Sequence, residues 1–212
     1  KPGDIADLVS LGDNLERVLD LWRFRGFPFP QVSQTTQLDT VHHALLGVFS
    51  LTHGPAARIG EIRILGEPWT AERIFRRELT FQNDDRFDLR ALRASRERLL
   101  ATGLFLDVSI AHVAASQPGI VDVEISVSER PGLIKDCLIS IAPAYLQSEG
   151  WLGIGLAMCP NLMGQNQRLS VIGQISALRQ LGDVQWVEPR LLDSRINLAI
   201  NAHRRRLIYP LF

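Results

Sequence analysis

The sequence has few of the features that mark the commonest functional classes. Its 212 residues include only two cysteines, Cys137 and Cys159, too few for a disulfide framework or a zinc knuckle. Lys and Arg number 23 against 23 Asp and Glu, so there is no basic excess and no nucleic acid is expected as a partner. No apolar run approaches the about 20 residues of a membrane helix. Membrane strands need only about 10 alternating residues each, so the sequence still allows them.

Catalytic and ligand-binding motifs are also missing. No motif places a nucleophile beside a base, and the acidic residues Asp84, Asp85 and Asp88 lack the glycine and terminal glutamate of a calcium loop. Gly153 and Gly155 lie in an alternating segment, where tight strand packing explains them better than a nucleotide-binding loop. We therefore expect a protein that is not an enzyme and that has no metal site and no cofactor.

Charged residues are distributed unevenly along the chain. Residues 133–212 contain 8 Lys and Arg and 5 Asp and Glu, whereas the first 132 residues hold the other 33 of the 46 charges. This change in composition indicates a domain boundary near Pro131 and Gly132.

An internal repeat relates two segments that lie 76 or 77 residues apart. The matched pairs are Leu15 and Leu92, Trp22 and Leu99, Gly26 and Gly103, Val32 and Val108, and Leu45 and Val121. The first copy begins near its second helix, where Asp13 and Glu16 are predicted to form a capping box. Strands are predicted after it at about 31–37 and 41–52. The chain is therefore expected to start inside a module.

The second copy predicts a complete strand-helix-helix-strand-strand order. A strand at 61–66 precedes a helix capped by Thr70, and Asp88 caps a second helix that ends before Gly103. In the next strand, Leu106, Val108 and Ile110 are predicted to face the core. The last strand alternates from residue 121 to residue 128, so that the helices can cover one apolar face of the sheet.

Beyond residue 133, apolar residues alternate with small or polar ones. The alternation predicts five strands, at about 137–147, 151–159, 167–177, 181–188 and 195–204. One face would be apolar and the other small or polar, as between lipid and a wet lumen. The predicted lipid-facing residues are Leu152, Ile154, Leu156, Ile196, Leu198 and Ile200. A soluble antiparallel sheet with one wet face is the alternative that alternation leaves open.

Two further expectations concern this segment. Cys137 and Cys159 fall on strands that one hairpin joins, and the sequence leaves open whether the two are bridged. Five strands are too few to close a membrane barrel, which needs at least about eight, so the remaining strands are expected beyond Phe212.

The order of these elements resembles the POTRA domain, a β-α-α-β-β module. The segment FDLRALRASRERLLATGLFLDVSI, with VDVEISVSERPG after it, is similar to the last POTRA domain of BamA/TamA-type outer-membrane protein assembly factors. The matching positions are Gly103, Leu104, Phe105, Val108, Glu129 and Pro131. PNLMGQNQRLS is similar to a barrel turn of that family, with Met163 replacing an aromatic residue and Asn166 replacing a glycine. VEPRLLDSR resembles the family's Glu-Pro segment at a later periplasmic turn.

The resemblance implies α+β POTRA modules followed by the antiparallel β-strands of an incomplete transmembrane β-barrel. Residues 1–59 would be a partial POTRA domain, residues 60–132 a complete one, and residues 133–212 the first strands of an outer-membrane β-barrel. The implied location is the bacterial outer membrane, with the POTRA domains in the periplasm.

The resemblance also implies a function in inserting or translocating proteins. An edge strand of the complete POTRA domain is expected to bind clients through its backbone; it comprises Phe105, Leu106, Asp107, Val108, Ser109, Ile110 and Ala111. In the family, the first barrel strand pairs weakly with the last and can open. Here that strand comprises Leu138, Ile139, Ser140, Ile141, Ala142, Pro143, Ala144 and Tyr145.

The expected partners are unfolded outer-membrane client proteins, periplasmic accessory proteins and outer-membrane lipid. Two alternatives remain open. A two-partner secretion exporter shares POTRA modules and a barrel but moves one dedicated client, and a soluble periplasmic POTRA scaffold would only bind partners. The alternation after residue 133 disfavours the scaffold.

Overall fold

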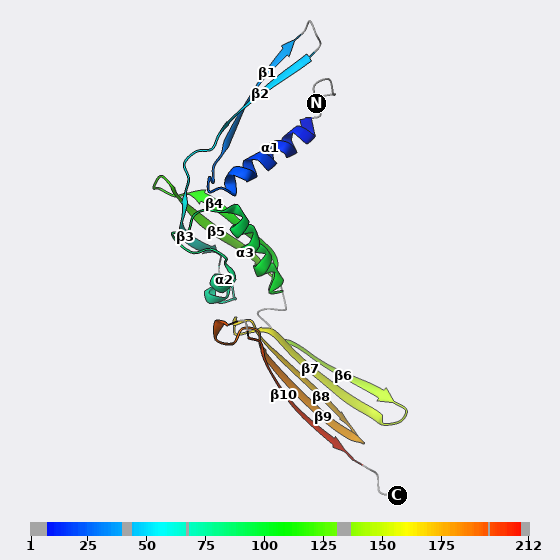
Figure 1. Cartoon of the computed structure of the whole chain (residues 1–212). Coiled ribbons are helices and arrows are strands. Elements are labelled where there is room, and N and C mark those ends of the chain that lie inside the picture. The colour runs from blue at the N-terminus through cyan, green and yellow to red at the C-terminus, as the bar shows by residue number, and fades with distance from the viewer. Residues whose placement is uncertain (1–7, 40–43, 67, 131–136, 195, 209–212) are drawn as a thin grey trace. The chain divides into compact units, whose positions relative to one another are not determined.

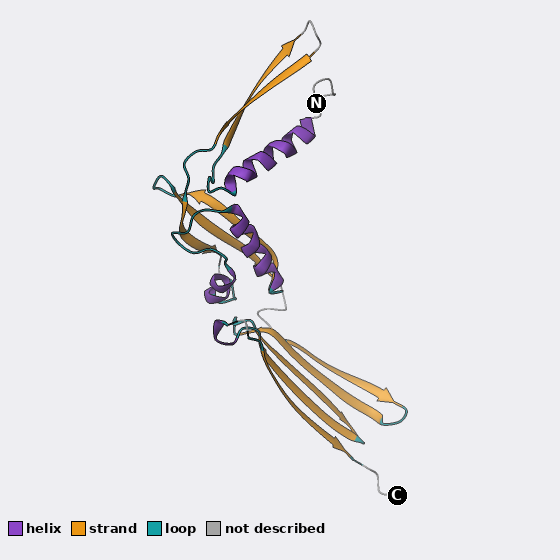
Figure 2. Ribbon diagram, in the orientation of Figure 1, coloured by secondary structure: helices purple, strands orange, loops and turns teal. Residues whose placement is uncertain are grey.

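The computed structural model describes residues 8–39, 44–66, 68–130, 137–194 and 196–208. They form helices and three separate β-sheets (Figure 1), and the secondary structure is mostly strand (Figure 2). The chain divides into two compact units, Lys1–Leu65 with Leu79–Arg98 and Ser109–Ser126, and Gly66–Glu78 with Leu99–Val108 and Val127–Phe212. Helix α2 (Glu72–Glu78) therefore belongs to the same unit as the C-terminal sheet.

The described chain begins with helix α1 (Leu8–Arg23). The predicted capping box is wrong, because Asp13 and Glu16 lie inside this helix rather than at its start. Apolar residues continue at helical spacing toward the N-terminus from residue 15 to residues 11 and 8, which extends the helix beyond Asp13. Gly26 follows the helix with φ +98°, a conformation that favours glycine.

Strands β1 (Gln31–Asp39) and β2 (Ala44–Thr52) form an antiparallel pair, with Gln31 opposite Thr52. Both strands confirm the prediction for the first repeat copy. The predicted start of the second strand at Val41 lies outside the described residues.

The central residues form the β-α-α-β-β module predicted from the second copy. Strand β3 (Arg58–Leu65) pairs in parallel with β5 (Ile120–Glu129), and β4 (Phe105–Ala114) completes the sheet in the order β3-β5-β4. Helices α2 and α3 (Leu89–Ala101) connect β3 to β4. Strand β4 therefore lies at an edge of the sheet, as predicted.

The helices and strands of this module share a buried apolar core. The side chains that are at most 2% exposed include Ile74, Phe75, Leu92, Leu99, Val108, Val121, Val123 and Ile125. Burying one such side chain stabilises the fold by about 1.5–3 kcal/mol. Asp88 caps α3, because its Oδ1 accepts a 2.8 Å hydrogen bond from the Arg90 amide. Gly103 has φ +76°, so both predicted ends of α3 are confirmed.

One prediction for β4 is wrong. Leu106 is 56% exposed, whereas Phe105 is 2% exposed and its ring centroid lies 5.2 Å from that of Phe75. Val108 is fully buried as predicted. Since Phe105 and Val108 are three residues apart, the strand departs from strict alternation, and the larger aromatic side chain occupies the core position.

The C-terminal sheet contains the five predicted strands in an antiparallel meander, in the order β10-β9-β8-β7-β6. They are β6 (Leu138–Leu146), β7 (Gly150–Leu162), β8 (Gln167–Ser176), β9 (Arg179–Glu188) and β10 (Leu198–Leu207). A short 3-10 helix, η1 (Leu191–Asp193), lies between β9 and β10.

The register separates two faces of this sheet, because directly opposed residues point to the same side. The apolar face carries Ile139, Ile141, Tyr145, Trp151, Val171, Ile175, Val184, Trp186, Leu198 and Ile200. The mixed face carries Leu152, Ile154, Leu156 and Met158 together with Ser170, Asp183, Gln185, Asn201 and His203. One face is thus more uniformly apolar than the other.

Two predictions for this sheet are wrong. Leu152, Ile154 and Leu156 lie on the opposite face from Leu198 and Ile200, because the register decides the face and the bulk of a side chain does not. The sixth residue of the predicted lipid-facing set, Ile196, precedes β10. Tight packing does not explain the β7 glycines either. A Cβ on residue 155 would meet nothing within 4 Å, and one on residue 153 would make ordinary contact with an isoleucine.

Cys137 and Cys159 form a disulfide, which resolves the question that the sequence left open. Their Cα atoms are 4.3 Å apart, and the bond joins the start of β6 to β7. Within the described residues, none of the helices has the length and apolar character needed to cross a membrane.

Candidate functional site

The edge strand β4 exposes part of its length. Leu106, Asp107, Ser109 and Ala111 are exposed, whereas Phe105 and Val108 are buried and Ile110 is partly buried. A strand at a sheet edge has one side on which its backbone is not paired within the sheet, and an extended peptide can add there. The structure therefore brings the predicted client-binding residues onto one strand edge.

The C-terminal half of β4 lies against the segment that follows α1. The ring nitrogen Nε2 of His112 donates to the Pro28 carbonyl oxygen at 3.1 Å, and Phe29 and Phe87 contact the imidazole ring. Burial lowers the pKa of His112; the hydrogen bond to Pro28 opposes this shift, and the charge of Arg23 adds to it. These contacts cover part of the strand beyond residue 111.

The predicted first barrel strand, β6, lies at an edge of the five-stranded sheet. Ile139 is 70% exposed, Ile141 82% and Tyr145 61%. Pro143 lies opposite Gly153 of β7 and lacks a backbone N–H, as is common for proline in an edge strand. The disulfide holds the beginning of this strand on β7. The covalent link and Pro143 therefore lie at different points along β6.

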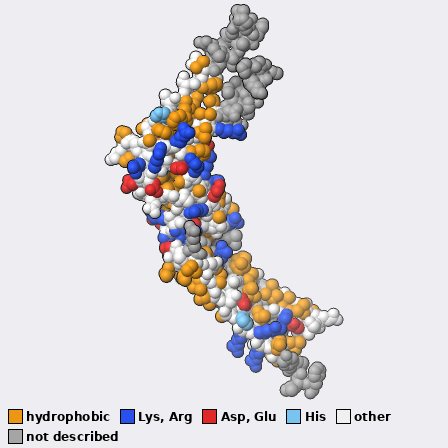
Figure 3. Space-filling view, viewed as in Figure 1, with side chains coloured by type: hydrophobic (Ala, Val, Ile, Leu, Met, Phe, Trp, Pro, Cys, Tyr) orange, Lys and Arg blue, Asp and Glu red, His pale blue; other side chains and the backbone are white. Residues whose placement is uncertain are grey.

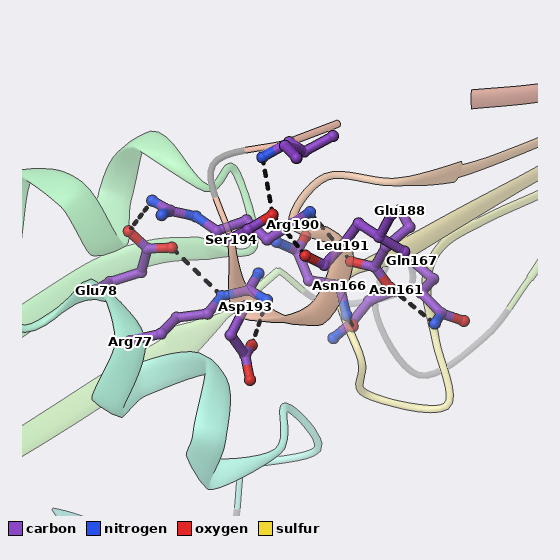
Figure 4. Close-up of polar contacts among 11 residues, drawn as sticks. Arg77, Glu78, Asn161, Asn166, Gln167, Glu188, Arg190, Leu191, Asp193 and Ser194 are labelled. Carbon is purple, nitrogen blue, oxygen red and sulfur yellow. Dashed lines mark hydrogen bonds and ion pairs between the residues drawn. The ribbon is translucent and has the colours of Figure 1, made fainter. Parts of the chain in front are cut away.

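A partly buried ionic cluster joins α2 to the segment between β9 and β10 (Figure 4). Arg190 Nη2 donates to Glu78 Oε2 at 2.8 Å, and Arg77 Nη1 lies 3.5 Å from Asp193 Oδ1. The side chains of Arg77 and Glu78 are 7% and 5% exposed. Paired charges at this depth favour one arrangement of the two segments, because separating them would leave a buried charge without its partner.

A second group of hydrogen bonds joins the residues before α2 to the turn after β7. Asn161 Nδ2 donates to Thr70 Oγ1 at 3.0 Å, and the Thr70 hydroxyl donates to Glu129 Oε1 at 2.7 Å. The amide of Ala71 donates to the Gly164 carbonyl oxygen at 3.0 Å. Thr70 is 2% exposed and Asn161 is 2% exposed, so these bonds are shielded from water.

The geometry of the turn after β7 explains why Gly164 occurs in the segment PNLMGQNQRLS. A Cβ on Gly164 would overlap the Trp69 carbonyl oxygen, and the residue has φ +71°. Met163 and Asn166 also have positive φ, at 54° and 59°. The Asn166 amide donates to Asn161 Oδ1 at 2.6 Å, which closes the turn without a second glycine.

Together, the ionic cluster and the Thr70 hydrogen bonds form what we call the α2 joint, defined by Thr70, Arg77, Glu78, Asn161, Arg190 and Asp193. Sequence reasoning missed the joint. It interpreted Thr70 as a helix cap, whereas the hydroxyl bonds to Glu129 and Asn161 instead.

Comparisons with known proteins agree with this architecture. Residues 57–130 match the POTRA family, described as surface antigen variable number repeat. The outer membrane protein assembly factor BamA of Neorickettsia risticii is 24% identical over 200 residues, 92% of this chain and 26% of that protein. Its counterpart in Nitratidesulfovibrio vulgaris is 23% identical over 200 residues, 94% of this chain and 24% of that protein.

Solved structures give the same result for the fold. BamA from Haemophilus ducreyi lacking POTRA domains 1–3 has a TM-score of 0.74 at 19% identity, covering 98% of this chain and 38% of that one. POTRA domains 3–5 of Haemophilus influenzae BamA give 0.56 at 20% identity, covering 60% and 50%. The chain is thus similar to BamA/Omp85-type proteins. It spans about a quarter of the length of the curated relatives it matches.

The order of the described elements agrees with this similarity. A POTRA module ends at β5, and an antiparallel sheet begins at β6, as in a partial barrel. The predicted recognition and fold class are therefore confirmed. The α2 joint links this module's α2 to the turns of that sheet within one compact unit.

Proposed function

We propose that this chain is part of an outer-membrane β-barrel assembly and translocation factor. Its POTRA domains bind unfolded client proteins, and its barrel inserts them into the outer membrane. The observation that carries the proposal is that one chain has a POTRA edge strand, β4, and an antiparallel sheet that begins with the edge strand β6. The curated relatives named as assembly factors are not enzymes, which agrees with the sequence prediction for this chain.

The first step is capture of a client at β4. Backbone groups at a strand edge bind an extended chain with little dependence on its sequence, which suits a factor that handles many clients. Residues 105–111 are the proposed binding segment, since the contacts of His112 cover the following part of the strand.

The second step is addition of a client strand at β6. The backbone of Leu138–Tyr145 acts as the template. Pro143 has no N–H to offer the last barrel strand, so fewer hydrogen bonds between the first and last strands must break before a client adds. The apolar face of the sheet lies against lipid and the mixed face lines the lumen. The proposal places the sheet in the outer membrane and the POTRA domains in the periplasm, with periplasmic accessory proteins as further partners.

The domain limits belong to the same proposal. Residues 1–59 form a partial POTRA domain, residues 60–132 a complete POTRA domain, and residues 133–212 the first barrel strands. The family match over residues 57–130 supports the second of these limits.

Site-specific photocrosslinking in the full-length protein tests the proposal. A photoreactive residue replaces Ile141 on the edge strand β6 or Ile175 on the interior strand β8, both on the apolar face and 82% and 60% exposed. During assembly of several unrelated barrel proteins, position 141 should crosslink to the clients and position 175 should not. Equal crosslinking at both positions would refute the edge mechanism. Crosslinking to one dedicated secreted protein alone would favour an exporter.

A further inference from the structure

Three consecutive arginines in β10, Arg204, Arg205 and Arg206, do not share one face of the sheet. The register places Arg204 opposite Gly182 and Arg206 opposite Gln180, on the apolar face with Ile200. Arg205 lies opposite Leu181 on the mixed face. Basic side chains gather near the end of β10 in the space-filling view (Figure 3). Two positive charges therefore interrupt a face that is otherwise apolar along this strand.

Neither Arg204 nor Arg206 has an ion-pair partner among the residues that the structure describes. Arg179, at the same end of the sheet, is paired with Glu149 at 3.1 Å, so neighbouring charge is neutralised where a carboxylate is available. In the described strands β6–β10, the one carboxylate on the apolar face is Glu188. It lies opposite Leu198, six residues from Arg204, which is about 20 Å along the strand.

The position of the two arginines along β10 matters for a sheet in a membrane. Arg206 is eight residues beyond Leu198, or about 26 Å along the strand and about 20 Å along the membrane normal for a tilt of about 40°. The apolar band of an outer-membrane barrel is about 25 Å tall. With Leu198 at one border of this band, Arg206 lies about 5 Å and Arg204 about 10 Å inside the border that is remote from the α2 joint, so their long side chains can extend to the lipid headgroups.

We propose that Arg204 and Arg206 bind the phosphate of an anionic lipid headgroup on the apolar face of the sheet. The inference rests on the proposed function, because it requires that this face contact lipid. Arg204 and Arg206 are two residues apart on one strand, so their Cα atoms are separated by about 7 Å. Both guanidinium groups can therefore reach one phosphate. A bound anion removes the repulsion between two like charges held at a surface of low dielectric.

The surroundings favour a lipid over a protein partner or a free ion. Ile175 and Val184 on the same face are 60% and 41% exposed, and Ile200 is 53% exposed, so apolar surface continues from the arginines toward the middle of the sheet. A lipid can contact both the charged and the apolar part of this surface, with its phosphate at the arginines and its acyl chains on the apolar residues.

Lipid retention by the full-length protein tests this inference. The protein is placed in phosphatidylcholine nanodiscs that contain a minor fraction of phosphatidylglycerol, released into zwitterionic detergent, and examined by native mass spectrometry. The double variant Arg204→Gln/Arg206→Gln should retain at least tenfold less phosphatidylglycerol than the parent protein. Arg205→Gln removes one positive charge from the other face of the same strand and should leave retention unchanged.

The outcomes separate this inference from the proposed function. Equal retention in the double variant and in Arg205→Gln would overturn the binding site. Displacement of the lipid by an equal concentration of inorganic phosphate would show that the site recognises the free anion, which also overturns it. A spin label at Ile200 should be quenched by a lipid-soluble reagent in the same nanodiscs. Absence of that quenching would refute the membrane location and with it the proposed function.

Discussion

Removing the carboxylate of Glu78 should loosen α2 from the segment between β9 and β10. The Glu78 side chain accepts from Arg190 at 2.8 Å and lies 3.4 Å from Arg77 Nε. Glu78→Ala leaves the 7% exposed Arg77 with Asp193, at 3.5 Å, as its carboxylate partner among the described residues. Deleting one member of a fully buried pair costs about 3–5 kcal/mol. Because Arg190 is 31% exposed, water reduces the expected cost to about 2–3 kcal/mol.

Hydrogen exchange of the full-length protein in detergent measures this loss locally. A cost of about 2–3 kcal/mol corresponds to about 30- to 150-fold faster exchange wherever opening of the joint controls the rate. Peptides covering α2 and residues 189–194 should both accelerate, because the ion pair holds both segments. Peptides from the middle of β8 should not change.

Glu72→Ala is the matched control on the same helix. Glu72 pairs with Arg76 at 2.6 Å, four residues along α2, but the two side chains are 62% and 53% exposed. Such an exposed pair contributes about 0.3–0.5 kcal/mol, so exchange should change about twofold. The reasoning is refuted if Glu72→Ala and Glu78→Ala have equal effects, or if Glu78→Ala accelerates α2 and leaves residues 189–194 unchanged.

Three other predictions follow from single features. Leu99→Ala, at a fully buried position, should lower the free energy of unfolding by about 2–5 kcal/mol in urea titrations. Arg98→Ala, at an exposed position on the same helix, should lower it by less than about 0.5 kcal/mol. Equal losses would show that Leu99 does not lie on the buried face of α3. Burial lowers the pKa of His112 in the folded protein, so the folded state favours the neutral imidazole. The stability that neutral His112 contributes is complete above the unfolded pKa of about 6.5 and is lost as pH falls through the lower folded pKa. Melting temperatures between pH 7.5 and 5 should fall less steeply in His112→Gln, and parallel curves would contradict this. Reducing the Cys137–Cys159 bond, which spans 22 residues, should destabilise the β6–β7 pair by about 3 kcal/mol. Hydrogen exchange in residues 138–146 should then become faster. Unchanged exchange would show that the disulfide does not hold β6 on β7.

Much of the fold could be predicted because its signals are local. Asp88 and Gly103 mark the ends of α3 through their own backbone preferences, and the five C-terminal strands follow from alternation within each segment. The start of α1 could not be placed from Asp13, because a residue that can cap a helix is also tolerated inside one. The position of Leu106 depended on which of two adjacent apolar residues fills the core, and neighbouring Phe105 does so.

The α2 joint could not be predicted, because its contacts connect residues far apart in sequence. Glu78 and Arg190 are separated by 112 positions, and Thr70 and Asn161 by 91. Nothing local distinguishes these side chains from solvated polar residues. The turn segment that includes Asn161 was singled out only by resemblance, and its hydrogen bonds appear only when α2 lies against it.

Covalent links to β7 at both ends of β6 limit how that strand can act under the proposed function. The joint includes Asn161 in β7, and Cys159 lies two residues before it on the same strand, so the disulfide holds β6 at the end of the sheet nearest α2. The hairpin after Leu146 lies at the opposite end, and Pro143 is closer to that end than to Cys137. Strand β6 is therefore tied to β7 at both ends, by the disulfide at Cys137 and by the hairpin after Leu146. A client strand can then pair with the open edge of β6, while the two covalent links keep β6 in register with the rest of the sheet.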